Sequence, residues 1–528
     1  MQTRDSLFER LERLNDVGAS LSAERDLDRL LEKILVAAMS ITHADGGTLY
    51  TATEDARYLR FRIVRNHSLG IAFGGSAGAT LPANFVDLPL YQADGRPNDH
   101  MIAPWAAVSG QTANIADAYA ETAFDFSGTL AFDRATGYRS RSFLTVPMRN
   151  HEGTVIGVLQ LLNATDAEAG GVHPFSKADQ SLAESLASQA AVALTNRALV
   201  EQLEHLFEGF IKLIDNAIDE KSPYTGGHCE RVPELTMMIA DAADQVREGP
   251  LADFKLSQKD RYELRIAALL HDCGKITTPV HVVDKATKLQ TIFDRIELVD
   301  TRMAAVRREA EAAAWREVAE GRPREQVLAQ LAQAQAVMDD DLAFLHRVNQ
   351  GGERLEEEAV QRIQAIAARY RWHAMDGTPR PLLTTEEVEN LSVRAGTLTA
   401  SEREVINHHI VSTIHMLEQL PWPAHLRNVP EYAGGHHERM DGRGYPRGLR
   451  REQMSVQARM MGIADIFEAL TAADRPYKPA MKLSQALSIM ERFRSEGHID
   501  PDLYDVFLAS RVPQRYAQRF LAPEQLDC

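Results

Sequence analysis

One helical pattern, from residue 182 to residue 217, constrains the fold of this chain most. Its mostly apolar positions alternate in steps of four and three residues: Leu182, Leu186, Gln189, Ala193, Asn196, Val200, Leu203, Phe207, Phe210, Ile214 and Ala217. A repeat of 3.5 residues is typical of a two-stranded coiled coil, in which an asparagine such as Asn196 fixes the register. The pattern predicts a connecting coiled-coil helix at 182–221 that forms a parallel homodimer and relays changes between the flanking domains. An amphipathic helix packed on its own chain is the alternative.

Length, charge and cysteine content limit what this helix can connect. A chain of 528 residues is too long for one core, and we expect about three or four structural units. The net charge of −17 argues against binding duplex nucleic acid. The three cysteines include no CxxC pair, which favours a reducing compartment. No apolar run approaches the ~18–20 residues that cross a bilayer and no signal peptide is evident, so we expect a cytoplasmic protein without a membrane span.

The residues before the connecting helix predict an α/β sensor-type domain at 1–181. Apolar residues at helical spacing fill positions 7–41, and segments 47–50 and 59–64 are typical of strands. Segments 142–148 and 154–163 predict two antiparallel strands joined by a turn at 151–153.

This arrangement resembles a GAF domain over about residues 7–196. GAF domains that bind cyclic nucleotides carry an Asn-Lys…Phe…Asp-Glu signature. Asn163, Phe175 and Asp179 fit that signature, whereas Ala164 and Gln180 replace its Lys and Glu. The resemblance implies either a sensor for an unidentified small ligand or a domain used for dimerisation and packing.

Histidines and aspartates recur along the second half of the chain. The apolar residues 266–270 predict that His271 and Asp272 lie on a buried helix, where an ionised aspartate is costly unless a cation compensates it. Lys275 follows at helical spacing and is expected on the same side. His228 is expected to begin another helix. The complete set has five histidines and two aspartates: His228, His271, Asp272, His409 (or its neighbour His408), His436, His437 and Asp465.

Imidazole and carboxylate groups in this number can build a two-metal centre with Asp272 as the bridging carboxylate. Two such metals lower the pKa of a bound water and stabilise the oxygens of a phosphodiester during hydrolysis. Nitrogen and oxygen ligands suit iron or manganese. Gly442, Gly444 and Pro446 predict a rigid loop directly after the last histidine pair.

Residues 222–502 resemble an HD-GYP domain, a branch of the HD metallohydrolases. The matching segments are 223–228, 271–275, 436–438, 441–446, 465 and 474–478. The resemblance implies an all-α domain that hydrolyses cyclic di-GMP, a bacterial second messenger, to pGpG and in some members to GMP. It also implies one metal held by His228, His271, Asp272 and Asp465, and a second held by Asp272, His409, His436 and His437. By the same resemblance Lys275 contacts the scissile phosphate or assists the leaving group, and Arg475 and Lys478 bind phosphate.

Two features depart from the family pattern. Members with three metals have a Glu where this chain has Tyr224, so we expect two metals. Residues 290–397, rich in Ala, Glu, Arg and Gln, are a predicted helical insertion between domain parts at 222–289 and 398–528.

The leading hypothesis is a dimeric, GAF-regulated cyclic di-GMP phosphodiesterase with two iron or manganese ions. One alternative is a non-hydrolytic cyclic di-GMP receptor that contacts a protein partner through residues 444–446. Another is an HD phosphohydrolase for a different cyclic dinucleotide, because base contacts decide the substrate and the sequence does not reveal them.

Overall fold

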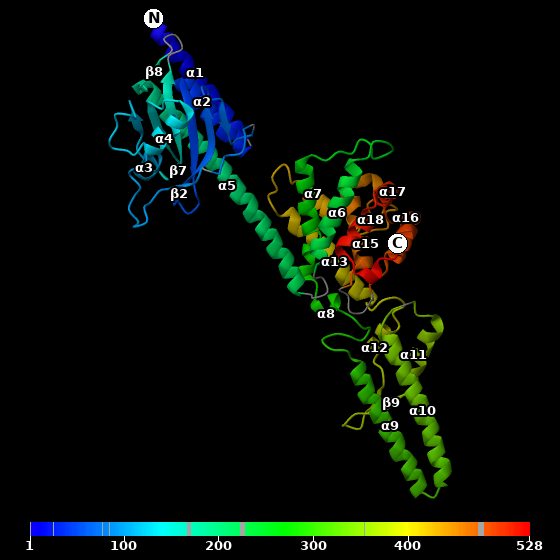
Figure 1. Ribbon diagram of the computed structural model, residues 1–528. Helices are drawn as coiled ribbons and strands as arrows, with labels where there is room; N and C mark the ends of the chain where they lie inside the picture. Colours follow the sequence, from blue (N-terminus) through cyan, green and yellow to red (C-terminus); the bar gives the residue numbers. More distant parts are fainter. Residues whose placement is uncertain are drawn as a thin grey trace. The chain divides into compact units, whose positions relative to one another are not determined.

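The chain forms two units, Met1–Phe207 and Glu208–Cys528. The computed structural model (Figure 1) describes residues 2–24, 26–76, 78–83, 85–165, 171–221, 227–352, 354–473 and 480–528. Within these residues, no helix combines the length and the apolar character that a membrane crossing requires.

The first unit is an α/β domain built on an antiparallel sheet. Its elements are α1 (Gln2–Ala23), α2 (Leu27–Thr42), β1 (Ala44–Ala52), β2 (Tyr58–Asn66), β3 (Ile71–Phe73), β4 (Leu88–Pro89), α3 (Ile102–Ser109), β5 (Ala113–Ile115), α4 (Ser127–Thr136), β6 (Phe143–Arg149), β7 (Val155–Thr165), β8 (Val172–His173) and α5 (Lys177–Lys221). The strand order is β3-β2-β1-β7-β6-β5, with β4 paired to β2 and β8 to β7. The predicted hairpin is confirmed, because β6 and β7 pair antiparallel with Phe143 opposite Leu162.

Helices cover both faces of this sheet (Figure 1). On one face, α1, α2 and the first turns of α5 bury a core that includes Leu31, Ile34 and Leu186. On the other face, α3 packs Ala103 against Val158. Leu182 and Leu186, the first two positions of the predicted coiled-coil seam, therefore pack inside their own domain.

The second unit is mainly helical. Its elements after α5 are α6 (His228–Asp244), α7 (Gln258–Leu270), η1 (Cys273–Thr277), α8 (Val280–Val283), α9 (Ile296–Ala319), α10 (Arg324–Asn349), α11 (Glu357–Arg369), β9 (Arg371–His373), β10 (Pro379–Pro381), α12 (Thr385–Leu391), α13 (Ala400–Glu418), α14 (Val429–Gly434), η2 (Arg451–Gln453), α15 (Val456–Thr471), α16 (Leu483–Ser495), α17 (Pro501–Ala509), α18 (Val512–Phe520) and η3 (Pro523–Gln525). Helices α6, α7, α13, α14 and α15 contact one another and position the candidate site. As predicted, α6 begins at His228.

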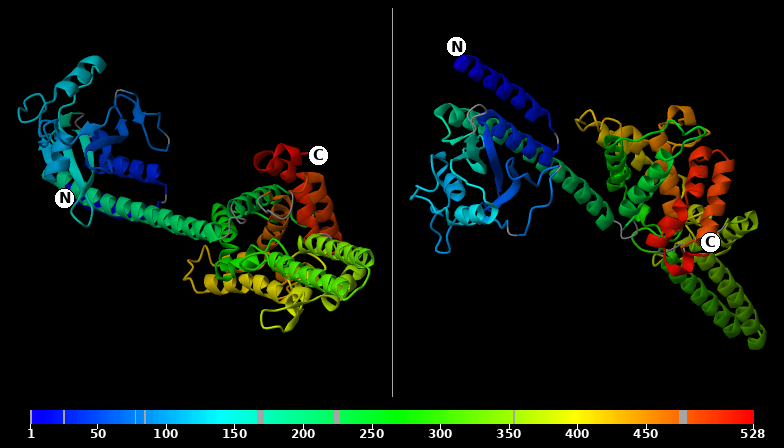
Figure 2. Two further views of the ribbon diagram at one scale, coloured as in Figure 1. Left: turned by 90° about the horizontal axis from the view of Figure 1, so that it is seen from below. Right: turned by 45° about the horizontal axis from the view of Figure 1, so that its top comes forward.

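Residues 290–397 build a helical arm with its own apolar core. Helices α9 and α10 lie side by side (Figures 1 and 2) and share this core with α11 and α12. A short antiparallel pair, β9 and β10, adds a strand element that the sequence pattern does not predict. The buried Lys285 ammonium donates to Glu402 on α13 (2.7 Å) and to Asn390 on α12 (2.7 Å), which joins the base of the arm to α13. The predicted boundaries at 222, 290 and 398 stay predictions.

Candidate metal centre

Five segments of the second unit bring the predicted ligands together. They are the first residue of α6, the turn after α7, the middle of α13, the loop after α14 and the middle of α15. They contribute His228, His271 with Asp272, His409, His436 with His437, and Asp465, respectively. His409 is buried, whereas the neighbouring His408 is exposed.

A first group of ligand atoms surrounds one oxygen of Asp272. Asp272 Oδ2 lies 3.2 Å from His228 Nε2 and 3.3 Å from His271 Nε2. His228 Nε2 also lies 3.4 Å from Oδ1 of Asp465. His228, His271 and Asp272 are all buried, so these groups interact in a region that excludes most solvent.

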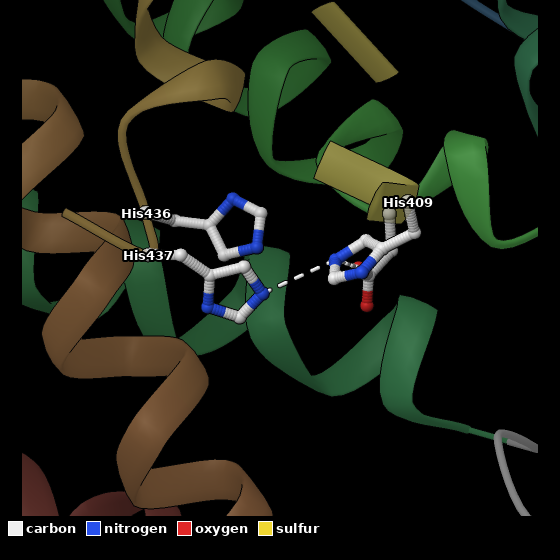
Figure 3. A group of neighbouring side chains, drawn as sticks. His409, His436 and His437 are labelled. Atoms are coloured by element: carbon white, nitrogen blue, oxygen red, sulfur yellow. Dashed lines mark hydrogen bonds and ion pairs between the residues drawn. The ribbon is translucent and has the colours of Figure 1, made fainter. Parts of the chain in front are cut away.

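A second group surrounds the other oxygen of the same carboxylate. Asp272 Oδ1 lies 3.2 Å from His409 Nε2, which in turn lies 3.1 Å from His437 Nε2 (Figure 3). The rings of His436 and His437 lie with their centroids 4.1 Å apart. His437 Nδ1 also lies 4.0 Å from Asp465 Oδ2, so Asp465, like Asp272, touches both groups.

Two buried atoms of this cluster have no hydrogen-bond partner among the described residues. They are Asp272 Oδ1 and His436 Nε2. An orphaned acceptor in a buried site is costly unless a ligand satisfies it. Carboxylate oxygen and imidazole nitrogen are ligands that iron, manganese and zinc accept. The donor set therefore fits divalent metal, with Asp272 shared by both groups.

Electrostatics hold most of these side chains in metal-binding forms. Burial alone disfavours an ionised Asp272, but Lys275 and the adjacent histidines keep the pKa of this carboxyl well below its ordinary value. The neighbouring histidines have the same effect on the pKa of Asp465, against the effect of burial. Burial, helped by His271, lowers the pKa of His436 to about 4, and burial beside His436 lowers that of His437. Ionised carboxylates and neutral imidazoles are the forms that bind a metal.

Hydrogen bonds from the far side of each ring orient the histidines. Three of them place Nδ1 against the backbone carbonyl three residues earlier: His271 with Ala268 (2.7 Å), His409 with Ile406 (2.5 Å) and His436 with Ala433 (2.7 Å). An Nδ1–H that donates to a carbonyl leaves Nε2 with its lone pair, which in His271 and His409 faces Asp272.

His228 is oriented by a carboxylate that the sequence analysis does not assign a role. Its Nδ1 contacts Glu468 Oε2, and Arg231 Nε donates to the other Glu468 oxygen at 2.7 Å. Glu468 is buried and lies three residues after Asp465, on the same side of α15. This three-residue spacing from Asp465 is the sequence signal that could have predicted Glu468 as a residue of the site.

Lys275 is placed by a 3₁₀ turn and not by a helix. Helix α7 ends at Leu270, and His271 and Asp272 lie between it and η1, so the prediction that both residues lie on a helix is wrong. Lys275 nevertheless reaches Asp272, with Nζ 2.5 Å from Oδ2. Burial alone would lower the pKa of Lys275, but Asp272 and Asp465 raise it, so the side chain stays a cation beside the two carboxylates.

The loop after His437 is held to the centre by Glu438. The two oxygens of Glu438 accept the backbone N–H groups of Arg447 and Leu449, both at 2.8 Å. A Cβ on Gly444 would overlap the backbone of residues 438–439, so this turn needs glycine at that position. The Tyr445 ring stacks on the His437 ring with centroids 4.8 Å apart. The predicted rigid loop thus packs against a candidate ligand.

Three residues singled out in the sequence lie outside the described residues. They are Tyr224 and the two predicted phosphate-binding side chains, Arg475 and Lys478.

In the first unit, the signature residues support the domain itself. Asn163 donates from Nδ2 to Tyr138 Oη (2.8 Å) and accepts from the Arg141 N–H (2.7 Å). Asp179 pairs with Arg10 of α1, and Phe175 is buried in the core. These contacts give each of the three residues a structural role within the domain, and that role requires no bound nucleotide.

Comparison with known proteins finds a domain family that matches each unit. The GAF domain model matches residues 26–194, and two HD domain models match residues 225–341 and 382–503. The chain is 38% identical over 141 residues to "3'3'-cGAMP-specific phosphodiesterase 1" of Vibrio cholerae serotype O1, covering 27% of this chain and 31% of that protein. It is 26% identical over 313 residues to "3'3'-cGAMP-specific phosphodiesterase 3" of the same organism, covering 59% and 41%. It is 36% identical over 115 residues to "Cyclic di-GMP phosphodiesterase PA4108" of Pseudomonas aeruginosa, covering 22% and 27%. The matched regions thus span between about a quarter and two fifths of these relatives.

Proposed function

We propose that this chain, which joins a GAF domain to an HD domain, is a metal-dependent phosphodiesterase acting on a cyclic dinucleotide. The observation that carries the proposal is the position of Asp272, whose two carboxylate oxygens face two groups of histidines. A carboxylate shared in this way suits a two-metal site for phosphodiester hydrolysis. The names of the relatives support a cyclic dinucleotide as the substrate class.

In this proposal seven side chains hold two divalent metals, with iron or manganese preferred. His228, His271, Asp272 and Asp465 hold one, and Asp272, His409, His436 and His437 hold the other. When bound, the metals supply a hydroxide nucleophile at neutral pH and neutralise charge on the phosphodiester oxygens.

The protein's own cations complete the proposed site. The Lys275 ammonium beside Asp272 is positioned to contact the scissile phosphate or the leaving oxygen, because it is the cation closest to the shared carboxylate among the described residues. Arg475 and Lys478, which lie outside the described residues, are proposed to bind the phosphates of the dinucleotide.

Cyclic di-GMP is the substrate we propose, with pGpG as the main product and GMP as a slower second product. The test incubates the full chain, loaded with iron or manganese under reducing conditions, with cyclic di-GMP and in parallel with 3'3'-cGAMP, and follows the products by chromatography. Linear product from cyclic di-GMP supports the proposal. Faster turnover of 3'3'-cGAMP would reassign the substrate, and binding without turnover would identify a receptor.

The GAF domain and α5 are proposed to regulate this activity in a dimer. Along α5, six exposed apolar side chains follow one another in steps of seven, four, three, four and three residues: Val192, Leu199, Leu203, Leu206, Phe210 and Leu213. Val200, next to Leu199, is exposed as well. This spacing has the 3.5-residue period of a coiled-coil seam, and it supports pairing with α5 of a second copy.

A further inference from the structure

The short turn η1 carries Lys275, and α13 holds it from one side. The Gly274 N–H donates to Thr413 Oγ1 at 2.9 Å. A Cβ on Gly274 would overlap the carbonyl oxygen of His409, so the turn lies directly against the helix that bears a candidate ligand. This contact fixes the start of the turn. At its end the Thr278 N–H donates to the Lys275 carbonyl at 3.1 Å, which leaves one lone pair of that oxygen for a further donor.

The last residue of α5 provides that second support. Lys221 Nζ donates to the Lys275 carbonyl at 3.2 Å and also to the Ile276 carbonyl. A lysine ammonium at the C-terminal end of a helical turn is favourable, because the carbonyl oxygens there carry partial negative charge. Lys221 therefore holds the backbone of the residue whose side chain reaches Asp272.

The final turns of α5 belong to the second unit. Ile211, Asp215 and Ile218, spaced by four and three residues, are buried on one side of the helix. The position of the Lys221 ammonium is therefore tied to the position of the α5 helix, which runs unbroken from Lys177.

We propose that Lys221 is a positioning residue for Lys275. Its ammonium holds the carbonyls of residues 275 and 276 in place, and this sets the direction in which the Lys275 side chain leaves the turn. A rotation or axial shift of α5 removes the ammonium from these carbonyls and lowers the catalytic rate without removing a metal ligand. The expected effect on the catalytic rate rests on the proposed function. The expected effect on the backbone of the turn rests only on the contact between Lys221 and the carbonyls of residues 275 and 276.

The test compares Lys221→Met, which keeps the apolar stem and loses the ammonium, with Lys221→Arg, which keeps a donor. Lys212→Met, an exposed lysine on the same helix, is the matched control. Misplacing a catalytic group costs up to about 100-fold in rate, so we expect Lys221→Met to lower kcat for cyclic di-GMP by roughly 10- to 100-fold. KM and metal content stay close to those of the wild type, and Lys221→Arg restores part of the rate.

A second readout needs no substrate. Amide hydrogen exchange in the peptide that covers η1 should be faster in metal-loaded Lys221→Met than in the wild type or in Lys212→Met. Unchanged exchange overturns the positioning role even if the wild type hydrolyses no cyclic dinucleotide. Faster exchange with an unchanged kcat would show that Lys221 stabilises the turn without acting on Lys275. That result would also overturn the positioning role. An inactive wild type refutes the proposed function separately.

Discussion

Asp272 and His409 face each other across the centre of the histidine cluster, with Asp272 Oδ1 3.2 Å from His409 Nε2. The other oxygen of Asp272 lies 3.2 Å from His228 Nε2, on a helix that begins 44 residues earlier in the chain than Asp272. One carboxylate thus joins two groups of imidazoles. Because both groups depend on it, the behaviour of Asp272 variants separates a two-metal centre from two unrelated clusters of histidines.

Replacing Glu468 with Gln should weaken metal binding without removing a ligand. Glu468 contacts His228 Nδ1 and orients the ring so that Nε2 faces Asp272. Loss of such an outer carboxylate typically costs about 10- to 100-fold in metal affinity. A metal titration of the apoprotein measures the effect, with the exposed Glu404→Gln as control. Equal affinity in Glu468→Gln and in the wild type would contradict the orienting role.

Metal binding should release a proton at neutral pH. Burial opposes charge on His228, yet the carboxylates of Glu468, Asp272 and Asp465 raise its pKa well above the ordinary value. We therefore expect His228 of the metal-free protein to keep its proton at pH 7, whereas His436, with a pKa of about 4, should already be neutral. A metal ligand must be deprotonated, so we expect about one proton to leave per chain, and the release to fall as pH rises through the raised pKa of His228.

Calorimetric titrations with the same metal in buffers of different ionisation enthalpy measure this proton release. A binding enthalpy that is independent of the buffer at pH 7 would contradict the proposed protonation of His228.

Acid should weaken the junction between the helical arm and α13. Burial alone would raise the pKa of Glu402, but hydrogen bonds from Lys285 and from the Thr399 N–H lower it. A carboxyl with a lowered pKa stabilises the fold fully above its unfolded value of 4.5, and the contribution is lost as pH falls through the folded pKa.

Glu402→Gln should therefore lower the Tm at pH 7 by roughly 1–3 °C, since Glu402 is 21% exposed and solvent partly screens its pair with the buried Lys285. The difference from the wild type should shrink below pH 4.5. Thermal unfolding at both pH values is the measurement, and Glu404→Gln serves as the control. A difference that persists unchanged in acid would exclude the ion pair as its cause.

A charged residue in the α5 stripe should abolish the proposed dimer. Leu203 is 65% exposed and lies in the middle of the apolar repeat, so Leu203→Glu would place two carboxylates against each other in a paired helix. Light scattering coupled to size exclusion should show a dimer for the wild type and for Gln202→Glu, and a monomer for Leu203→Glu. A monomeric wild type at micromolar concentration would refute pairing through α5.

The sequence predicts the period of the apolar stripe on α5 but not which residues form it. Apolar residues occur as adjacent pairs on α5, for example Leu199 with Val200, Leu206 with Phe207 and Leu213 with Ile214. Two seams therefore have the same period: they share Leu203 and Phe210 and differ by one residue at the paired positions. Packing in the folded chain partly covers Phe207 and Ile214 and leaves Leu206 and Leu213 exposed, whereas Leu199 and Val200 are both exposed. The sequence pattern does not contain this packing.

The metal centre was more predictable than its surroundings. Histidines and aspartates on apolar segments identify the candidate ligands, because buried charge needs compensation. The sequence pattern does not predict the contact between Glu468 and His228, because the two residues are 240 positions apart in the chain. The sequence pattern also does not predict that α7 ends before His271. Gly274 packs against α13 just after this point, and that contact exists only in the folded chain.

The number of metals bound by Asp272 variants shows whether one carboxylate serves two metals. The full chain and its Asp272→Asn variant are loaded with manganese or iron, freed of excess metal, and analysed for metal per chain, with the exposed Asp253→Asn as control. We expect about two metals per chain in the wild type and the control. We expect nearly none in Asp272→Asn, because the shared carboxylate serves both groups. Two metals retained in Asp272→Asn, or none in the wild type, would contradict a two-metal centre that shares Asp272.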